Sequence, residues 1–388
     1  MFKFKTCDPL VKLLATFNRI VPARAADSES VIILEATEKA LLVGIANEGK
    51  TAVAHLTRED GYTFKSNVAL GIPYYVFNSF VKRLPKTKSI VFKKSRNTLA
   101  YATDNNSFTG NLTTVTDVDY KAALMALSFA QDVQPDSYIS LLTDDVNSVR
   151  RYLLFDTFGF SDEPPAVKLK LYKKRFVFIA SDAFSGALYK AKQNYKNIPS
   201  SGLIIPGYVF SVLAAFETGG FVDGTSIPVA VSANEIIIRS KHLYCVLPKL
   251  EYTSPLDLTD FLDSCSDKKP TVTFAINSSM LTSMIRDVTT IAEVNRVAPV
   301  TITVTKRSLS LQTKTLYGKV KKEVKNDVSN VTFSKAGNSK YSFTVYSKVL
   351  VEFVTSFKNE PLLFEVYDSF IVQRTKESGV VYGYALKD

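Results

Sequence analysis

The sequence predicts an α+β fold made of six tandem copies of one small unit, paired into three domains. In each copy a short apolar strand leads into an amphipathic stretch of about three helical turns, and alternating strands follow. These strands are rich in β-branched residues, which favours antiparallel sheets. The copies begin at residues 2–4, 68–70, 125–127, 203–205, 272–274 and 341–343. Two copies make one domain of ordinary size, so we predict domains at 1–119, 120–254 and 255–388, with polar linkers at 115–121 and 251–270.

Composition limits the classes of function. The 388 residues include 48 Lys and Arg against 37 Asp and Glu, a net charge of +11 that suits a polyanionic partner such as nucleic acid. Three cysteines without close spacing favour a reducing compartment, and no run is apolar enough to span a bilayer or act as a signal peptide, so we expect a cytoplasmic protein. With only His55 and His242, far apart in sequence, we expect no metal site, no cofactor and no catalysis.

Prolines mark where several helices begin. Asp8 is a predicted N-cap with Pro9 behind it, and the second and fourth copies share an Ile-Pro pair at 72–73 and 205–206, with each proline expected at the first helical position. The third copy has Pro135.

The first two helices should each present a basic face. In the first, Leu10, Leu13, Leu14 and Phe17 form the expected buried stripe, and the opposite face carries Lys12, Thr16 and Arg19. The second should bury Val76, Phe77 and Phe80 and expose Asn78, Ser79, Lys82, Arg83 and Lys86. The third carries Asp136, Asp144 and Asp145, whose charge has the wrong sign for a polyanionic partner. Any single lysine here also fits an ordinary solvated helix face.

A row of such domains leaves terminal edge strands open, and closing the row into a ring through a second copy would remove them. The sequence resembles a known family, the bacterial β-type sliding clamp of DNA polymerase, over essentially the whole chain. The most specific stretches are 149–153, 179–182 and 198–206, and the resemblance implies that 149–153 enters a strand of the middle domain. The chain departs from the family at 181–186, in its last five residues and in its basic charge, which suits a divergent, phage-encoded clamp.

The resemblance implies a head-to-tail homodimeric ring with helices lining a hole, antiparallel sheets outside and duplex DNA threaded through it. It implies contacts between DNA polymerase or a clamp loader and the ring through a short peptide. The residues that would contact DNA, independently of its sequence, are Lys12, Arg19, Arg24, Lys82, Arg83, Lys86, Lys192, Arg286 and Lys348. The peptide pocket would comprise Leu153, Ser181, Phe184, Leu188, Pro255, Tyr384 and Leu386, each of which also fits plain core packing. Phe108, Leu112, Val288 and Ile291 are predicted for the dimer interface.

The main rival to a clamp is a nucleoside triphosphatase. Residues 44–51 match the phosphate-loop pattern G-x-x-x-x-G-K-T, and 152–156 form an apolar run ending in Asp. That motif needs a helix directly after Lys50, whereas residues 51–57 alternate like a strand, so we expect a hairpin tip. The composition also fits a β-rich nucleic-acid binder without ring closure, or a virion or scaffold protein.

Overall fold

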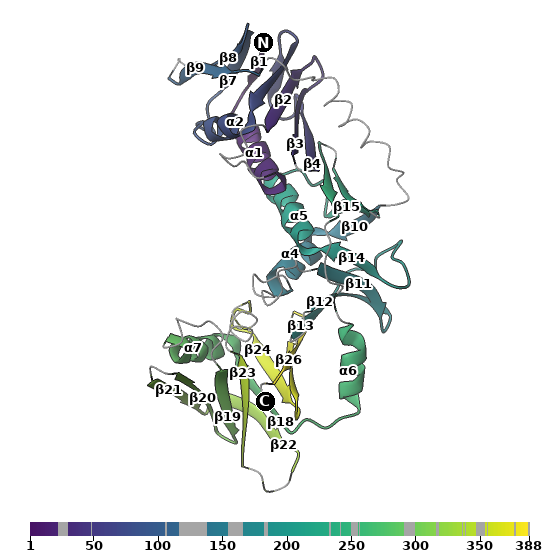
Figure 1. The fold of residues 1–388 in the computed structure, drawn as a ribbon, viewed down its shortest axis with the longest axis vertical. Helices are drawn as coiled ribbons and strands as arrows, with labels where there is room; N and C mark the ends of the chain where they lie inside the picture. Colours follow the sequence, from purple (N-terminus) through teal and green to yellow (C-terminus); the bar gives the residue numbers. More distant parts are fainter. Residues whose placement is uncertain are drawn as a thin grey trace. The chain divides into compact units, whose positions relative to one another are not determined.

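The computed structural model describes residues 1–21, 30–47, 49–104, 107–115, 138–153, 166–181, 185–232, 234–240, 242–249, 255, 257–290, 299–315, 318–335, 337, 339–346, 354, 356–375 and 378–386. The chain forms two compact units. The first comprises residues 1–146, 195–197 and 209–250, and the second comprises 147–194, 198–208 and 251–388. Each unit holds two of the four sheets (Figure 1), and every ladder between the described strands is antiparallel.

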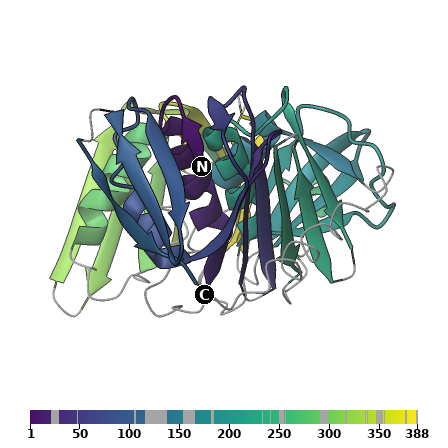
Figure 2. The ribbon, with the colours of Figure 1, turned by 90° about the horizontal axis from the view of Figure 1, so that it is seen from above.

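The smaller sheet of the first unit has five strands and a core of aromatic rings. Phe2 stacks on Phe92 at 5.0 Å between ring centroids, and Phe4 lies 5.8 Å from Tyr62. Figure 2 shows helix α1 (Asp8–Ile20), in purple, behind the blue strands of this sheet. The strand order is β5 (Tyr62–Phe64), β1 (Phe2–Phe4), β7 (Ile90–Ser95), β8 (Thr98–Thr103) and β9 (Thr109–Thr113).

The larger sheet of the first unit has eight strands, and segments far apart in sequence meet in it. The ladder between β4 and β17 joins residues 51–54 to residues 243–246. The strand order is β10 (Ile139–Leu142), β15 (Ser226–Val231), β16 (Glu235–Arg239), β17 (Leu243–Pro248), β4 (Lys50–Leu56), β3 (Leu41–Asn47), β2 (Val31–Ala36) and β6 (Val68–Pro73). Helix α1 packs on β4, and α2 (Tyr74–Val81) packs on β2 and β6.

The larger sheet of the second unit has nine strands. Its middle ladder pairs β13 with β26, so that residues 185–189 lie beside residues 380–384. The strand order is β14 (Leu203–Pro206), β11 (Ala166–Tyr172), β12 (Arg175–Ser181), β13 (Ser185–Lys190), β26 (Val380–Ala385), β25 (Phe370–Thr375), β24 (Pro361–Val366), β18 (Val272–Asn277) and β22 (Val328–Phe333).

A four-stranded sheet completes the second unit, with α7 (Ser278–Thr289) packed against two of its strands. The N-cap of α7 is Asn277, whose side chain accepts a hydrogen bond from the Ser279 amide at 2.9 Å. The strand order is β21 (Gly318–Lys325), β20 (Ser308–Thr315), β19 (Pro299–Thr305) and β23 (Lys340–Tyr346).

Most of the strand-to-helix units occur at the positions predicted from the sequence. Strands β1, β6, β14 and β18 lead into α1, α2, α5 (Gly207–Gly219) and α7. The predicted caps are each off by one residue: Cys7, rather than Asp8, is the N-cap of α1, and Pro73, predicted at the first helical position, is the N-cap of α2. Of the sixth unit, β23 is described and residues 347–353 lie outside the described residues.

The third strand-to-helix unit differs from the prediction. Residues 125–127 and Pro135 lie outside the described residues, and the strand-to-helix pair is instead β10 followed by α4 (Thr143–Tyr152). Residues 149–152, expected to enter a strand, therefore form the last turn of α4. Asp144 and Asp145 in the first turn and Arg150 and Arg151 in the last complement the helix dipole, a signal that the prediction overlooked.

The predicted hairpin at the phosphate-loop motif is confirmed. Strands β3 and β4 pair from Leu41↔Leu56 to Asn47↔Lys50, and Gly49 adopts a left-handed φ of +75° at the tip. Lys50 thus begins a strand at the position where a phosphate loop requires the start of a helix.

The prediction of a polar linker at 251–270 is also wrong, because this stretch contains helix α6 (Leu258–Ser266). Asp257 caps this helix by accepting a hydrogen bond from the Thr259 amide at 3.1 Å. None of the helices described here is both long and apolar enough to cross a membrane.

Candidate functional site

Helix α1 presents part of the predicted basic face. Leu10, Leu13, Leu14 and Phe17 are buried as predicted, and Lys12 and Arg19 are exposed. Lys12 also forms an ion pair with Asp8, one turn earlier, at 2.8 Å. Because this pair is exposed, it is weak and leaves the lysine available to a stronger anion.

Thr16 does not belong to that face, contrary to prediction. Its hydroxyl is buried and donates to the Ala215 carbonyl on α5 at 3.2 Å and to the Lys12 carbonyl at 3.1 Å. Gly219 on α5 lies so close that a Cβ there would collide with Thr16 Oγ1. Thr16 is therefore part of the contact between α1 and α5 and is closed to a ligand.

The end of α2 and the turn after it add three cations to α1. Lys82, Arg83 and Lys86 are all exposed. The Lys86 carbonyl accepts a hydrogen bond from the Asp8 amide at 3.1 Å, and Asn78 Nδ2 donates to Asn18 Oδ1 at 3.5 Å. The start of α1 thus lies beside the turn after α2, and α1 and this turn together carry five exposed cations.

The burial predicted along α2 is wrong at two positions. Val76 is 41% exposed, whereas Asn78 is 3% exposed. Phe77 and Phe80 are buried as predicted, and Phe80 contacts Phe92 and Tyr101 of the five-stranded sheet. Because α2 packs against both sheets of its unit, its apolar face does not follow a single helical stripe.

Helix α4 carries less exposed negative charge than predicted. Asp145 is fully buried and accepts a hydrogen bond from the Tyr195 hydroxyl at 2.6 Å, so this carboxylate does not face a ligand. Asp136 lies outside the described residues. Arg150 and Arg151 are exposed, and Arg151 Nε donates to the Ser356 carbonyl at 2.9 Å. The exposed surface of α4 therefore has two cations against Asp144.

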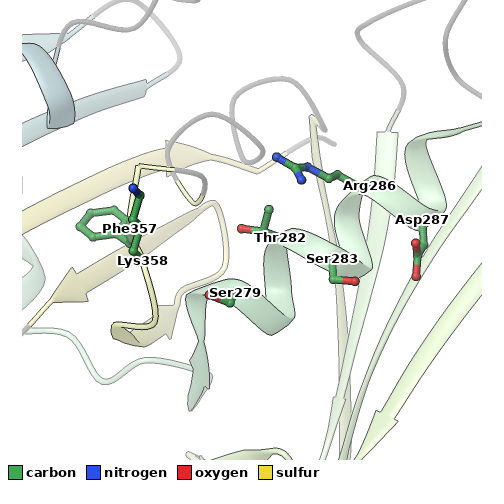
Figure 3. A pocket seen from close by; sticks show the side chains of 7 residues that line it. All are labelled: Ser279, Thr282, Ser283, Arg286, Asp287, Phe357 and Lys358. Carbon is green, nitrogen blue, oxygen red and sulfur yellow. The ribbon is translucent and has the colours of Figure 1, made fainter.

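In the second unit, Arg286 on α7 lines a surface hollow of about 340 Å³ together with Lys358 (Figure 3). The close-up shows the two cations on opposite sides of the hollow, with the hydroxyls of Thr282 and Ser283 on the helix side. Asp287 also lines it, but its carboxylate pairs with Lys322 at 2.8 Å. Two cations and adjacent hydroxyls suit the oxygens of a phosphate. Lys358 was missed by the prediction.

The structure describes one of the three remaining predicted DNA contacts. Lys192 is exposed in the segment after β13. Arg24 and Lys348 lie outside the described residues.

Three of the predicted peptide-pocket residues lie on neighbouring strands: Ser181 on β12, Leu188 on β13 and Tyr384 on β26. Leu188 on β13 is buried in a cluster with Val177 and Ile179, and Leu258 and Leu262 of α6 pack over this cluster. Ser181 pairs with Gly186 in the ladder between β12 and β13. Helix α6, which the prediction missed, thus covers the surface around Leu188.

The other predicted pocket residues are placed less closely. Pro255 is buried, and the Leu386 amide donates to the Ser369 carbonyl at 3.0 Å. Leu153 is buried directly after Tyr152, whose ring packs on Tyr189 and Phe357. Phe184 lies outside the described residues, and Tyr384 is described only as a strand position paired with Ser185.

Of the predicted dimer residues, Leu112 and Val288 are buried within their own units. Phe108 is half-buried, with its ring stacked on Phe80 at 6.1 Å, and Ile291 lies outside the described residues. Strand β9, which carries Leu112, is an edge of the five-stranded sheet.

The two histidines are closer than their sequence separation suggested. The His55 amide donates to the His242 carbonyl at 2.8 Å, and burial, followed by the nearby charge of His242, lowers the pKa of His55. Within the described part of the chain, no group of three or more His, Cys, Asp or Glu side chains is arranged to hold a metal ion.

Solved structures of other proteins match this chain over its whole length. The beta subunit of the Streptococcus pyogenes DNA polymerase matches with a TM-score of 0.78 at 16% identity, over 100% of this chain and 99% of that one. The Bacillus subtilis DNA polymerase sliding clamp matches with a TM-score of 0.75 at 14% identity, over 100% and 98%. The chain has the sliding-clamp fold. The Thermotoga maritima DNA polymerase III beta subunit matches over 100% of both chains, with a TM-score of 0.74 and 13% identity.

No protein-family model and no curated protein matches this sequence. The predicted α+β architecture of repeated β-α-β units, with antiparallel sheets, is confirmed by the matches to solved structures.

Proposed function

We propose that this chain is a DNA sliding clamp: two copies close head to tail into a ring that encircles duplex DNA and tethers a DNA polymerase. The observation that carries the proposal is the match of the entire chain to bacterial sliding clamps. A shared fold does not by itself assign a function, so the residues of this chain must supply further support.

The distribution of charge supports DNA as the ligand. A net charge of +11 accompanies five exposed cations on α1 and directly after α2, and the two cations Arg286 and Lys358 that line the hollow. Lysine and arginine contacts to phosphates bind DNA without reading its sequence, as movement along DNA requires. The proposed set of contacts comprises Lys12, Arg19, Arg24, Lys82, Arg83, Lys86, Lys192, Arg286 and Lys348, extended by Lys358.

The proposed ring uses three clamp domains per chain, at 1–119, 120–254 and 255–388. Because Leu112 and Val288 are already buried in their own units, we assign the dimer contact to exposed groups near them, including the open edge of β9. Such a ring would act without catalysis and without a cofactor, in the cytoplasm of a bacterium or an infected host cell.

The test is topological. A duplex is fixed to a bead by one end, the protein is added at low salt so that rings can thread over the free end, and that end is then blocked with a bulky protein. After a wash in moderate salt, we expect retention only on DNA blocked at both ends, followed by release when a restriction enzyme cuts the duplex. Equal retention on blocked and open DNA would contradict the proposal.

Mass measurement of the native particle provides the second test. A ring of two chains has twice the 43.0 kDa mass of one chain. A particle of one or three chains would contradict the proposed dimer. A β-rich DNA binder without ring closure would behave as a single chain and lose DNA steeply with salt, whether or not the ends were blocked.

A further inference from the structure

One side of helix α7 carries polar side chains and forms a wall of the surface hollow in Figure 3. These side chains belong to Ser279, Thr282, Ser283 and Arg286. Their spacing of three or four residues places them on the same side of the helix. The opposite side is buried and comprises Leu281, Met284, Ile285 and Val288. We call the space bordered by the polar side and by Asp287, Phe357 and Lys358 the α7 hollow.

The wall opposite α7 is the turn that carries Lys358, and hydrogen bonds tie this turn to the start of the helix. The Asn359 amide donates to the Ser279 hydroxyl at 3.3 Å, and that hydroxyl donates to Asn359 Oδ1 at 2.6 Å. The Glu360 amide donates to the Ser278 hydroxyl at 3.1 Å, and the Ser278 amide donates to the Glu360 carbonyl at 2.9 Å. The two walls are therefore set relative to each other before a ligand binds, which reduces the cost of ordering the site.

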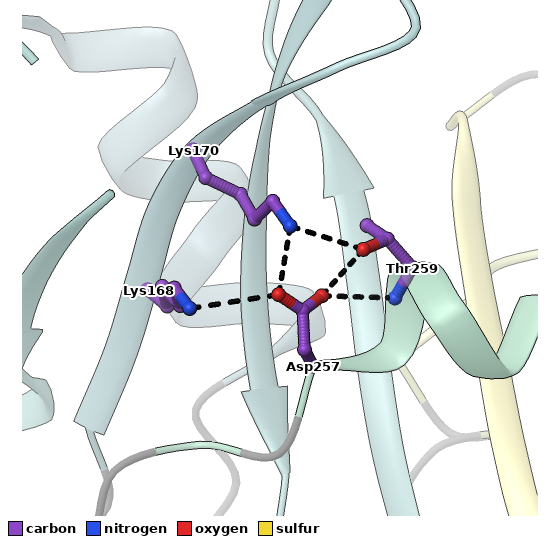
Figure 4. A network of polar contacts seen from close by, with 4 residues as sticks. All are labelled: Lys168, Lys170, Asp257 and Thr259. Carbon is purple, nitrogen blue, oxygen red and sulfur yellow. Dashed lines mark hydrogen bonds and ion pairs between the residues drawn. The ribbon is translucent and has the colours of Figure 1, made fainter. Parts of the chain in front are cut away.

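Several other lysines of the second unit are paired with carboxylates. Asp257 receives Lys170 Nζ at 2.7 Å and Lys168 Nζ at 3.5 Å (Figure 4). At the α7 hollow, Asp287 pairs in the same way with Lys322 at 2.8 Å. The carboxylate that lines the hollow is therefore already occupied by a lysine from outside it.

Arg286 and Lys358 differ from these paired lysines. Both are exposed, they lie on opposite sides of the hollow in Figure 3, and neither side chain forms an ion pair or a hydrogen bond with any residue that the structure describes. The hydroxyls of Thr282 and Ser283 also lack a hydrogen-bond partner within the described ranges. The α7 hollow thus presents two positive charges and two hydroxyl donors that are available to a ligand.

These donors suit a phosphoryl group better than a carboxylate. The planar guanidinium of Arg286 can donate to two phosphate oxygens at once, and Lys358 supplies a second positive charge. The hydroxyls of Thr282 and Ser283 can donate to further oxygens. A carboxylate has only two oxygens and one charge, so it cannot use both cations and both hydroxyls. The volume of the hollow, about 340 Å³, lies at the lower end of the range for small-ligand sites, about 300–1,000 Å³.

We propose that the α7 hollow is a built site for a single phosphoryl group, which is bound between Arg286 and Lys358 and oriented by the hydroxyls of Thr282 and Ser283. Cations on an open helix face attract phosphate by charge alone, whereas this site also fixes the direction of the phosphate oxygens. A backbone phosphate of DNA and a free phosphate ester share this chemistry. The inference rests on the proposed function only for the first of these two sources.

Inorganic phosphate is the direct probe, added to the full-length chain at an ionic strength held constant with chloride. The phosphorus-31 NMR line width of phosphate reports the bound fraction, and its concentration dependence gives a dissociation constant. We expect the binding to saturate as a single site. Arg286→Ala with Lys358→Ala should weaken it about tenfold or more, because both charge-assisted contacts are lost.

Lys306→Ala with Arg307→Ala is the matched control, because it removes two exposed cations from a turn of the same unit. This variant should bind phosphate like the parent chain. An equal loss of affinity in both double variants, or the absence of saturable binding to the parent, would overturn the inference.

A second pair of substitutions separates a built site from attraction by charge alone. Thr282→Val with Ser283→Ala leaves every charge in place and removes the two hydroxyl donors, so the affinity should fall about threefold or more. Sulfate, with the same tetrahedral oxygens as phosphate, should compete with it, and acetate should compete at least about tenfold less well. Unchanged affinity in this variant, or equal competition by the two anions, would overturn the inference.

A short blunt duplex with hydroxyl groups at both 5′ ends identifies the source of the phosphoryl group. Competition between this duplex and inorganic phosphate assigns the α7 hollow to a backbone phosphate of DNA. Phosphate that stays bound at saturating duplex assigns the hollow to a free phosphate ester, and both results support the site. The retention assay on blocked DNA separates the two proposals, because a chain that fails to be retained can still bind inorganic phosphate.

Discussion

Thr16 on α1 donates a buried hydrogen bond to the Ala215 carbonyl on α5, at 3.2 Å, across 199 residues of sequence. Gly219, one turn later on α5, lies directly against the same hydroxyl. The approach of the two helices thus depends on a small residue on one and a hydroxyl on the other.

Substitutions at this contact should be coupled. Gly219→Ala should lower the free energy of unfolding by about 1–3 kcal/mol, because the added methyl collides with Thr16 Oγ1 and the Phe221 ring. Thr16→Ala alone should cost about 1 kcal/mol through the lost hydrogen bond. Because Thr16→Ala removes one of the two collisions, the double variant should lose less than the sum, by about 0.5 kcal/mol or more, in urea unfolding. Strict additivity would contradict this packing.

The buried carboxylate of Asp145 makes Tyr195 important for stability. Tyr195→Phe removes a hydroxyl that donates to Asp145 at 2.6 Å, and a hydrogen bond to a buried charge contributes about 1.5–3 kcal/mol. Tyr62→Phe is the matched control, because its hydroxyl donates to the neutral carbonyl of Thr37 at 2.7 Å and should cost about 0.5–1.5 kcal/mol. Thermal and urea unfolding measure both. An equal loss in the two variants would contradict the larger contribution expected from the hydrogen bond between Tyr195 and Asp145.

Asp257 should make the stability of the chain depend on pH in acid. Burial alone would raise the pKa of Asp257, but hydrogen bonds from Lys170 and Thr259 and the charge of Lys170 outweigh it and lower the pKa well below its usual value. A carboxyl group with a lowered pKa stabilises the folded state above its unfolded pKa, near 4, and this contribution is lost as the pH falls further.

The corresponding experiment compares the melting temperatures of the parent chain and Asp257→Asn. We expect the parent to be more stable at pH 7, with the difference shrinking steadily below about pH 4. A difference that stays constant down to pH 2 would show that the ion pairs with Lys168 and Lys170 contribute nothing.

The cations after α2 should contribute a measurable share of the salt dependence of DNA binding. Replacing Lys82, Arg83 and Lys86 by alanine should reduce the slope of log affinity against log salt by up to about 2.7, because each phosphate contact contributes about 0.9. Lys306→Ala with Arg307→Ala, in the exposed turn between β19 and β20, is the control and should leave the slope unchanged. Binding of a random-sequence duplex over a salt series measures both. Equal slopes would remove these cations from the proposed contact set.

Local signals in the sequence determined much of this protein. The apolar strands, the prolines that end β6 and β14, and the turn at Gly49 each act within a few residues, so the pattern alone predicted most of the units, most helices and the hairpin at 44–51. The buried stripe of α1 also followed from helical period, because that helix lays one apolar face on its neighbours. The basic composition and the likeness to sliding clamps were available at the same stage.

The tertiary structure decided which polar groups are closed to solvent and which short helix exists at all. Thr16, Asn78 and Asp145 have polar side chains that a sequence pattern assigns to the surface, yet distant elements bury them and supply hydrogen-bond partners, the Ala215 carbonyl for Thr16 and the Tyr195 hydroxyl for Asp145. Helix α6 is too short to be specified by its own sequence, and Gly186 and Gly383 give it a place to pack. Burial is a property of the partners that the fold brings together, and for Thr16 that partner lies 199 residues away along the chain.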